Sequence, residues 1–230
     1  MQAPVSLRYR PRVSAVPPPL DETLLAAAAR ELAGRDPHLA EVIRRHGLPP
    51  LWSRPPGFPT LVHIVLEQQV SLASANAAFG RLRASVEPLT PAGFLELDDA
   101  QLLRIGFSRR KTGYVRDLAR SIVSGALDLD TLAALPDDEV EMALVARRGI
   151  GPWTAAIYLM EALLRPNVWP AQDIALATAV AEVSGRGARP GVAELATMGD
   201  AWRPWRSVAA RLFWHDYLSR RGRSLADPPA

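Results

Sequence analysis

Apolar residues recur along most of this chain at intervals of three and four positions, which is the spacing of one face of an amphipathic helix. The segment 108–124 shows the pattern clearly, because Val115, Leu118 and Ile122 fall on one face and Gly125 follows as a residue that can end a helix. No segment sustains the alternation of apolar and polar residues that is typical of a half-buried strand. The pattern therefore predicts an all-α fold.

The ends of the expected helices are marked by residues that favour helix boundaries. Prolines start or stop several of them. Three side chains can accept a hydrogen bond from a free N–H group at a helix start, namely those of Asp21, Thr60 and Ser108. The segments predicted as helical are 22–33, 36–46, 61–68, 71–85, 91–97, 99–105, 108–124, 136–146, 152–164, 173–184, 192–198 and 204–220.

The start of the chain differs from the rest. Residues 1–19 include prolines at positions 4, 11, 17, 18 and 19, and proline resists helix formation. We expect an extended arm over residues 1–19, with an edge strand over 5–9 as an alternative. A single helical domain over 20–230 is expected to follow it.

Composition excludes several kinds of site. The chain has 230 residues, 48% of them hydrophobic, so it can bury a substantial core without covalent staples. It has no cysteine, which excludes disulfides, cysteine nucleophiles, thiolate zinc sites and cysteine-bound iron–sulfur clusters. No apolar run reaches the roughly 18 residues of a membrane span, and the N-terminus lacks the apolar core of a signal peptide. We therefore expect a cytoplasmic protein without membrane contact.

The basic residues are twenty-six arginines and one lysine, Lys111. Net charge is only +3, which by itself does not decide whether the partner is a polyanion. The positions of the arginines are more informative than their number.

A short glycine motif lies between the predicted helices 136–146 and 152–164. Gly149, Ile150 and Gly151 can form a tight turn whose backbone approaches a phosphate closely, and a helix that begins at residue 152 directs its free N–H groups to the same place. Such a helix–hairpin–helix contacts the nucleic-acid backbone without reading bases. Glycines between helices also serve as ordinary caps, so the motif alone leaves both interpretations open.

Several segments, in the same order and at similar spacing, resemble the helix–hairpin–helix (HhH-GPD) DNA glycosylase superfamily, most closely its alkylation-repair branch of 3-methyladenine DNA glycosylase II (AlkA) type. The resemblance covers roughly residues 20–218. Too few residues precede it for the separate β-rich N-terminal domain of that branch. The matching segments are 67–71 (EQQVS), 105–108 (IGFS), 149–155 (GIGPWTA), 170–173 (PAQD) and 202–207 (WRPWRS).

The resemblance implies two helical subdomains with an active-site cleft between them. One subdomain is expected over 58–164 and contains the hairpin, and the other combines 20–57 with 165–230. Enzymes of this superfamily flip a damaged nucleotide out of the duplex, because the glycosidic bond cannot be reached inside the stack.

Asp173 aligns with the catalytic aspartate of the family. Cleavage of an N-glycosidic bond develops positive charge on the sugar, which a nearby carboxylate can stabilise while it also orients or deprotonates water. An aspartate that opens a helix is also a common N-cap, and both roles can hold for the same residue.

The resemblance also assigns the pocket. Trp153 and Trp214 align with its aromatic residues, and an electron-rich indole attracts a cationic alkylated purine by about 1–2 kcal/mol. Ile157 stands where the enterobacterial relative has tyrosine, so the pocket is expected to be less aromatic. Phe107 is a further candidate for the pocket wall, with a core position as its alternative.

The expected DNA contacts surround the hairpin. Gln69 aligns with the wedge residue that fills the gap left by the flipped nucleotide. Arg148, the glycine motif at 149–151, Trp153 and Thr154 are expected to approach the DNA backbone. The family often binds Na⁺ or K⁺ at the hairpin, and the alignment gives the backbone carbonyls of Val145, Arg147 and Ile150 as its ligands.

The strand-cleaving branch of the superfamily has a lysine just after the hairpin, which forms a Schiff base with the sugar. Trp153 occupies that position here, so the resemblance implies a monofunctional enzyme that uses water as nucleophile and requires no cofactor. We expect Lys111 to contact a phosphate or to face solvent.

Taken together, these features predict a monomeric enzyme that excises alkylated purines from double-stranded DNA. One alternative is a glycosylase for another lesion, such as uracil, hypoxanthine or ethenoadenine. The other is a non-catalytic DNA-binding module. A carboxylate of Asp173 that faces a cleft with Trp153 and Trp214 nearby would favour the enzyme, whereas one that only caps its own helix in solvent would not.

Overall fold

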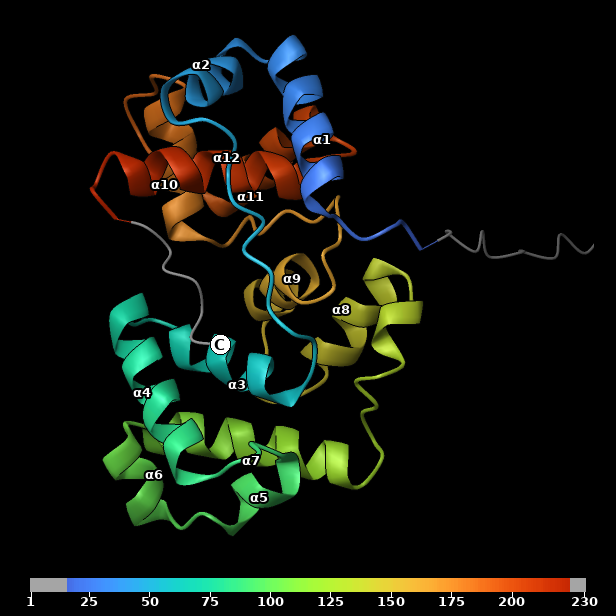
Figure 1. Ribbon diagram of the computed structural model, residues 1–230, viewed down its shortest axis with the longest axis vertical. Helices are drawn as coiled ribbons and strands as arrows, with labels where there is room; N and C mark the ends of the chain where they lie inside the picture. The colour runs from blue at the N-terminus through green and yellow to red at the C-terminus, as the bar shows by residue number, and fades with distance from the viewer. Residues whose placement is uncertain (1–15, 224–230) are drawn as a thin grey trace, which may run out of the picture.

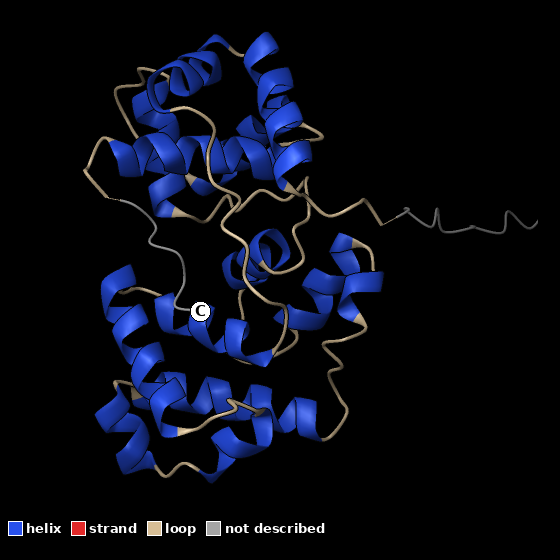
Figure 2. Cartoon of the chain, viewed as in Figure 1, coloured by secondary structure: helices blue, strands red, loops and turns tan. Residues whose placement is uncertain are grey.

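The computed structural model describes residues 16–223, and every regular element in that range is helical (Figure 2). The predicted all-α fold is therefore confirmed. The expected edge strand over 5–9 and most of the expected arm lie outside the described residues, while 16–20 are irregular. The helices are α1 (Glu22–Arg35), α2 (Pro37–His46), α3 (Phe58–Glu67), α4 (Leu72–Ser85), α5 (Pro91–Glu96), α6 (Asp99–Ile105), α7 (Arg109–Val123), α8 (Asp137–Val145), α9 (Pro152–Glu161), α10 (Ile174–Val183), α11 (Val192–Met198) and α12 (Arg206–Ser219), with 3₁₀ turns at Leu132–Ala134 and Gly199–Trp202.

Most predicted caps are confirmed. The side chains of Asp21 and Ser108 accept hydrogen bonds from the first turns of α1 and α7. Ser71, which was expected inside its helix, is the N-cap of α4 instead. Thr60 is the exception, because α3 begins two residues earlier, at Phe58, and the Thr60 hydroxyl donates instead to the carbonyl of Pro55 at 2.5 Å. The hydroxyl therefore ties the first turn of α3 to the connector before it.

The helix α9 ends at Glu161, three residues before the predicted end. Leu164 adopts φ 53°, a left-handed conformation that turns the chain out of the helix. Arg165, 2% exposed, then donates from its guanidinium to the carbonyls of Ala133 and Leu135 at 2.8 and 3.0 Å. A buried arginine that satisfies carbonyls of another segment thus replaces the last turn of the expected helix.

The helices pack in two groups (Figure 1). In the first, α12 contacts α1, α2 and α10. In the second, α3 contacts α4, α7 and α9, while α7 contacts α5 and α6, and α8 packs on α9. The first group lies at the top of Figure 1 and the second at the bottom, with α9 between them.

The two groups are joined through α9 and the connector that precedes α3. Arg211 of α12 is only 1% exposed, and it donates to the carbonyls of Leu51, Ser207 and Met160 at 2.8, 3.0 and 2.6 Å. Burial lowers the pKa of Arg211 to about 10, so it stays charged at neutral pH. One side chain therefore fixes the connector and the end of α9 against α12.

Among residues 16–223, no helix has both the length and the apolar character that crossing a bilayer requires. This finding agrees with the absence of a long apolar run in the sequence.

Candidate active site

A cleft of about 1300 Å³ is lined by residues from both helix groups. Its wall includes the turn between α3 and α4, the start of α7, the turn between α8 and α9, one face of α9, the start of α10 and part of α12. Asp173, Trp153 and Trp214 all line it. The structure therefore brings these three residues together at one cleft, and their role as a site stays a prediction.

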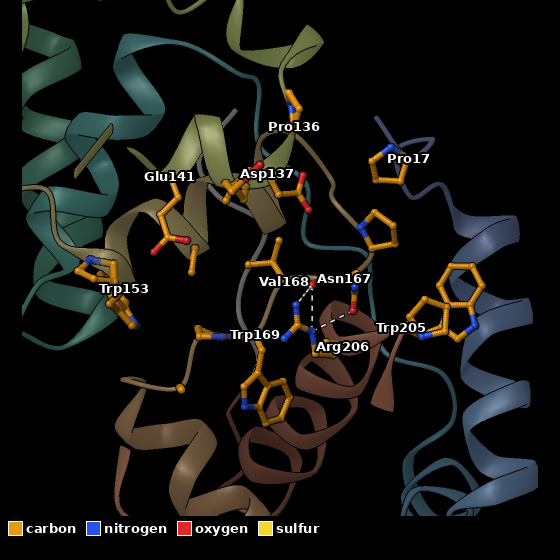
Figure 3. A pocket seen from close by; sticks show the side chains of 18 of the residues that line it. Pro17, Pro136, Asp137, Glu141, Trp153, Asn167, Val168, Trp169, Trp205 and Arg206 are labelled. Atoms are coloured by element: carbon orange, nitrogen blue, oxygen red, sulfur yellow. Dashed lines mark hydrogen bonds between the residues drawn. The ribbon is translucent and has the colours of Figure 1, made fainter. Parts of the chain in front are cut away.

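A smaller pocket of about 780 Å³ is lined by Pro17, Asp137, Glu141, Trp169 and Trp205, among others (Figure 3). Asp173 does not line this pocket. Trp153 and Gln172 contribute to the walls of both pockets, so the two pockets are neighbours.

The predicted helix–hairpin–helix consists of α8, the turn 147–151 (the hairpin turn) and α9. Gly149 adopts φ 83°, and a Cβ at this position would lie 2.1 Å from the ring of Tyr114 in α7. Both the backbone conformation and the close approach therefore require glycine. Ile150 is 4% exposed and anchors the turn in the core, while no side chain caps the first turn of α9. The N–H groups at the start of α9 are thus left for a ligand.

The carboxylate of Asp173 accepts three hydrogen bonds. Its Oδ1 accepts from the backbone N–H of Leu176 at 2.6 Å, which makes it the N-cap of α10, and from the indole N–H of Trp214 at 3.2 Å. Its Oδ2 accepts from the indole N–H of Trp153 at 2.8 Å. The residue is half-buried and lines the cleft, so it does more than cap its own helix in solvent.

These hydrogen bonds change the expected geometry of the two indoles. Each presents its N–H edge to Asp173, and Trp214 is 8% exposed. The tryptophans therefore hold the carboxylate in place from two sides, a role that the sequence prediction of aromatic pocket walls did not include. Sequence spacing placed them nearby but could not specify the direction of their N–H groups.

The other predicted pocket residues have different outcomes. Ile157 lines the cleft and is 4% exposed. The prediction that Phe107 lines the pocket is wrong: it is 1% exposed, it does not line the cleft, and its ring packs on Phe94 at 5.7 Å between centroids. Phe107 follows α6 directly, where the chain passes through the core before α7 begins.

The turn between α3 and α4, residues 68–71, lies at the rim of the cleft. Gln69 is exposed there and adopts φ 58°. Gln68 is turned inward, and its amide donates to the carbonyl of Gly149 at 2.9 Å and to the hydroxyl of Thr154 at 3.0 Å. Thr154 is 1% exposed, so its side chain, predicted near DNA, instead connects this turn to the hairpin turn.

Lys111 has a structural role that neither expectation included. Its ammonium group donates to the carbonyls of Leu66 and Gln68 at 2.7 and 2.9 Å. It thereby satisfies the free carbonyls at the end of α3, and this burial lowers the pKa of Lys111. The predicted solvated face is therefore wrong, because the ammonium is turned to these carbonyls, whereas the phosphate contact stays a prediction.

The two arginines of the hairpin turn differ in exposure. Arg148 is exposed, with one ion pair to Asp117 at 3.6 Å and its guanidinium 5.9 Å from the ring of Tyr114. Arg147 is half-buried, and its carbonyl accepts a hydrogen bond from the N–H of Ile150 at 3.1 Å. A carbonyl oxygen has two lone pairs, so the turn remains compatible with the expected Na⁺ or K⁺.

A group of charged residues in the cleft wall was missed by sequence reasoning. Arg54 pairs with Glu67 at 2.8 Å and with Glu161 at 2.6 Å. Both carboxylates are 8% exposed and all three residues line the cleft. The sequence did contain one indication of this group, because Glu161 follows Trp153 by two helical turns and so lies on the same face of α9. Within the described residues, no cluster of histidine, aspartate and glutamate is arranged to hold a metal ion.

Comparison with known proteins places this arrangement among DNA repair proteins. Residues 62–206 match the HhH-GPD superfamily base excision DNA repair protein family. YfjP of Bacillus subtilis strain 168, named as a candidate DNA-3-methyladenine glycosylase, is 30% identical over 184 residues, or 76% of this chain. This chain spans 64% of the length of YfjP.

Two solved structures share the fold. The 3-methyladenine DNA glycosylase of Schizosaccharomyces pombe in complex with abasic DNA superposes with a TM-score of 0.78 at 24% identity, covering 89% of this chain and 100% of that chain. The DNA-3-methyladenine glycosidase of Bacillus halodurans superposes with a TM-score of 0.70 at 29% identity, covering 85% and 91%.

Proposed function

This chain belongs to the HhH-GPD superfamily of base excision DNA repair proteins, and from that premise we propose that it is a DNA glycosylase. Its substrates are alkylated purines such as 3-methyladenine and 7-methylguanine in double-stranded DNA, and its reaction is hydrolysis of the N-glycosidic bond. The names of the proteins it resembles support this substrate class, since two of them are 3-methyladenine glycosylases by name.

The observation that carries the proposal is the carboxylate of Asp173, fixed by three donors in a cleft beside the hairpin turn. As the base departs, positive charge develops on the sugar, and a preorganised carboxylate stabilises it without reorganisation. Water then attacks the sugar from the side that Asp173 orients. The indole donors of Trp153 and Trp214 keep the carboxylate in one orientation for this task.

The DNA is held by the hairpin turn and the α3–α4 turn. The N–H groups at the start of α9 and the exposed Arg148 bind phosphates, and Gln69 enters the gap left by the flipped nucleotide. A Na⁺ or K⁺ ion held by the carbonyls of Val145, Arg147 and Ile150 would strengthen the phosphate contact. The two helix groups act as the subdomains 58–164 and 20–57 with 165–230, one on each side of the flipped base.

The enzyme is monofunctional. No amine lies at the position after the hairpin, where Trp153 stands, and the ammonium of Lys111 is committed to two carbonyls. The product is therefore an abasic site in an intact strand. A panel of duplexes that contain alkylated purines, uracil, hypoxanthine or ethenoadenine would test the substrate class, and release of uracil without any alkylated purine would refute it.

The catalytic role is tested with Asp173→Asn. We expect loss of base release, together with unchanged binding to a duplex that carries a tetrahydrofuran abasic analogue. Asp200→Asn is a matched control, because Asp200 is exposed and pairs only locally with Arg203 at 2.8 Å. Normal base release by the Asp173 variant would favour a DNA-binding module in which the aspartate is only a helix cap.

A further inference from the structure

Arg54, Glu67 and Glu161 form a buried patch of the cleft wall, which we call the cleft floor. Glu67 comes from α3, Glu161 from the end of α9, and Arg54 from the connector between α2 and α3. The backbone N–H of Arg54 donates to the carbonyl of Glu161 at 2.8 Å, and its side chain forms the two ion pairs. Arg54 is therefore held in place at both main chain and side chain.

The hydrogen bonding of the cleft floor is incomplete among the described residues. Nη1 of Arg54 is buried and has no hydrogen-bond partner. Oε2 of Glu161 forms an ion pair with Nε of Arg54 at 2.6 Å and is buried without a hydrogen-bond partner. Buried charged atoms with unused hydrogen-bonding capacity are costly, so the wall of the cleft is strongly polar at Glu161 and Arg54, which both line it.

The cleft floor is aligned with the proposed catalytic carboxylate. Trp153, Ile157 and Glu161 follow one another at intervals of four residues, so they lie on one face of α9, and all three line the cleft. Trp153 is bonded to Asp173 at one end of this face. On the proposed function, a flipped base with its glycosidic bond at Asp173 can extend along Ile157 toward Glu161.

Charges from four segments face Glu161. They belong to Arg54 of the connector, Glu67 of α3, Arg211 of α12 and Asp173 at the start of α10. Burial has the largest effect and raises the pKa of Glu161 to about 7, with a smaller contribution in the same direction from Glu67. Above that pH the group is a pure acceptor, and below it the group can also donate.

We propose that Glu161 reads the edge of the flipped base by accepting a hydrogen bond from the amino group at position 6, so that the cleft prefers alkylated adenine to purines with an oxygen at position 6. If the base has an oxygen at that position, this oxygen and the carboxylate of Glu161 are both acceptors and face each other, so neither is paired. Ile157, the intervening residue, offers no polar group. Arg54 is a positioning residue that holds the carboxylate in register.

This inference rests on the proposed function, and its test separates the two. Duplex DNA methylated with dimethyl sulfate contains 3-methyladenine and 7-methylguanine together, so one reaction at pH 8 gives the ratio of their release rates. We expect Glu161→Gln, whose amide can donate as well as accept, to lower the ratio of 3-methyladenine to 7-methylguanine by on the order of 10-fold. The ratio does not depend on the fraction of folded enzyme.

The matched control is Asp216→Asn, since Asp216 is a carboxylate of 2% exposure that pairs with Arg220 at 2.8 Å but does not line the cleft. Its ratio is expected to equal that of the wild-type chain. A second measurement needs no variant: lowering the pH from 8 to 6 should lower the wild-type ratio, because a protonated Glu161 can donate to the oxygen at position 6.

Four outcomes are decisive. A lower ratio in Glu161→Gln, with a fall at pH 6 in the wild type, supports the proposal. Release of both bases with ratios unchanged by the substitution and by pH overturns the role of Glu161 and leaves the proposed function intact. Release of neither base by the wild type overturns both. If Glu161→Gln fails to bind the tetrahydrofuran duplex, the wild-type pH series alone decides.

Discussion

The substitution Gly149→Ala tests whether the hairpin turn needs glycine for two separable reasons. The backbone has φ 83°, where an L-residue costs about 1–2 kcal/mol. The new Cβ would also lie 2.1 Å from Cγ of Tyr114, and such overpacking typically costs about 1–3 kcal/mol after the neighbours shift. The sum is about 2–5 kcal/mol.

Thermal unfolding measures this cost. For a chain of this size, 1 kcal/mol changes Tm by about 2–4 °C, so Gly149→Ala should lower Tm by roughly 4–20 °C. Gly151→Ala is the matched control, because Gly151 has φ −97° and nothing lies within 4 Å of an added Cβ. Its Tm should change by less than about 3 °C, as expected for a substitution without a clash.

A double-mutant cycle separates the two terms. In a Tyr114→Gly background both the ring and the Cβ, which would lie 2.6 Å from the new Cβ, are gone, so Gly149→Ala should cost only the backbone term, about 1–2 kcal/mol. Equal costs in both backgrounds would show that the ring does not constrain position 149. If Gly149→Ala were no more destabilising than Gly151→Ala, the whole argument from the left-handed turn would be refuted.

Three further predictions concern the cleft. Trp153→Phe removes the indole donor to Asp173 but keeps an aromatic ring. Loss of this one hydrogen bond should lower the rate of base release by about 10-fold, while binding to the tetrahydrofuran duplex stays within about 2-fold. Equal losses in both assays would contradict a role in orienting Asp173. Gln68→Ala removes the hydrogen bonds to Gly149 and Thr154, and the loss of one to two hydrogen bonds should lower Tm by about 2–6 °C. An unchanged Tm would show that these bonds do not stabilise the fold. Burial raises the pKa of Glu161 to about 7 from an unfolded value of 4.5, so between these pH values the folded state binds more protons than the unfolded state. The free energy of unfolding should therefore fall as pH rises from 4.5 to 7, and chemical denaturation should show a smaller fall in Glu161→Gln. Identical pH profiles of the two proteins would refute the raised pKa.

The helices themselves could be predicted from the sequence, because their signals are local. Ser108 caps α7 as expected, and the predicted segment 99–105 is α6 without change. The end of α9 could not be predicted, since it depends on where a buried arginine finds carbonyls in another segment. Boundaries set by tertiary contacts leave no pattern in the adjacent residues.

The candidate site was predicted in part, and for a similar reason. Alignment with a family places Asp173, Trp153 and Trp214 together, but an apolar residue such as Phe107 carries the same signal in a core as in a cleft. The cleft floor was missed because Arg54 and Glu161 are more than a hundred residues apart in the chain, and ionic contacts across that separation have no spacing rule. Only the position of Glu161 on the same face of α9 as Trp153 could have indicated the cleft floor.

The links of Gln68 and Lys111 have a mechanical consequence. They tie the α3–α4 turn to the hairpin turn and to α7, so the two elements proposed to contact DNA have a fixed separation. On the proposed function, any change of shape needed to satisfy both contacts has to come from the duplex, so the elastic work of binding falls on the nucleic acid. Damaged base pairs that stack weakly bend with less work, so this rigid pair of turns would select lesions by the stiffness of the helix before any base enters the cleft.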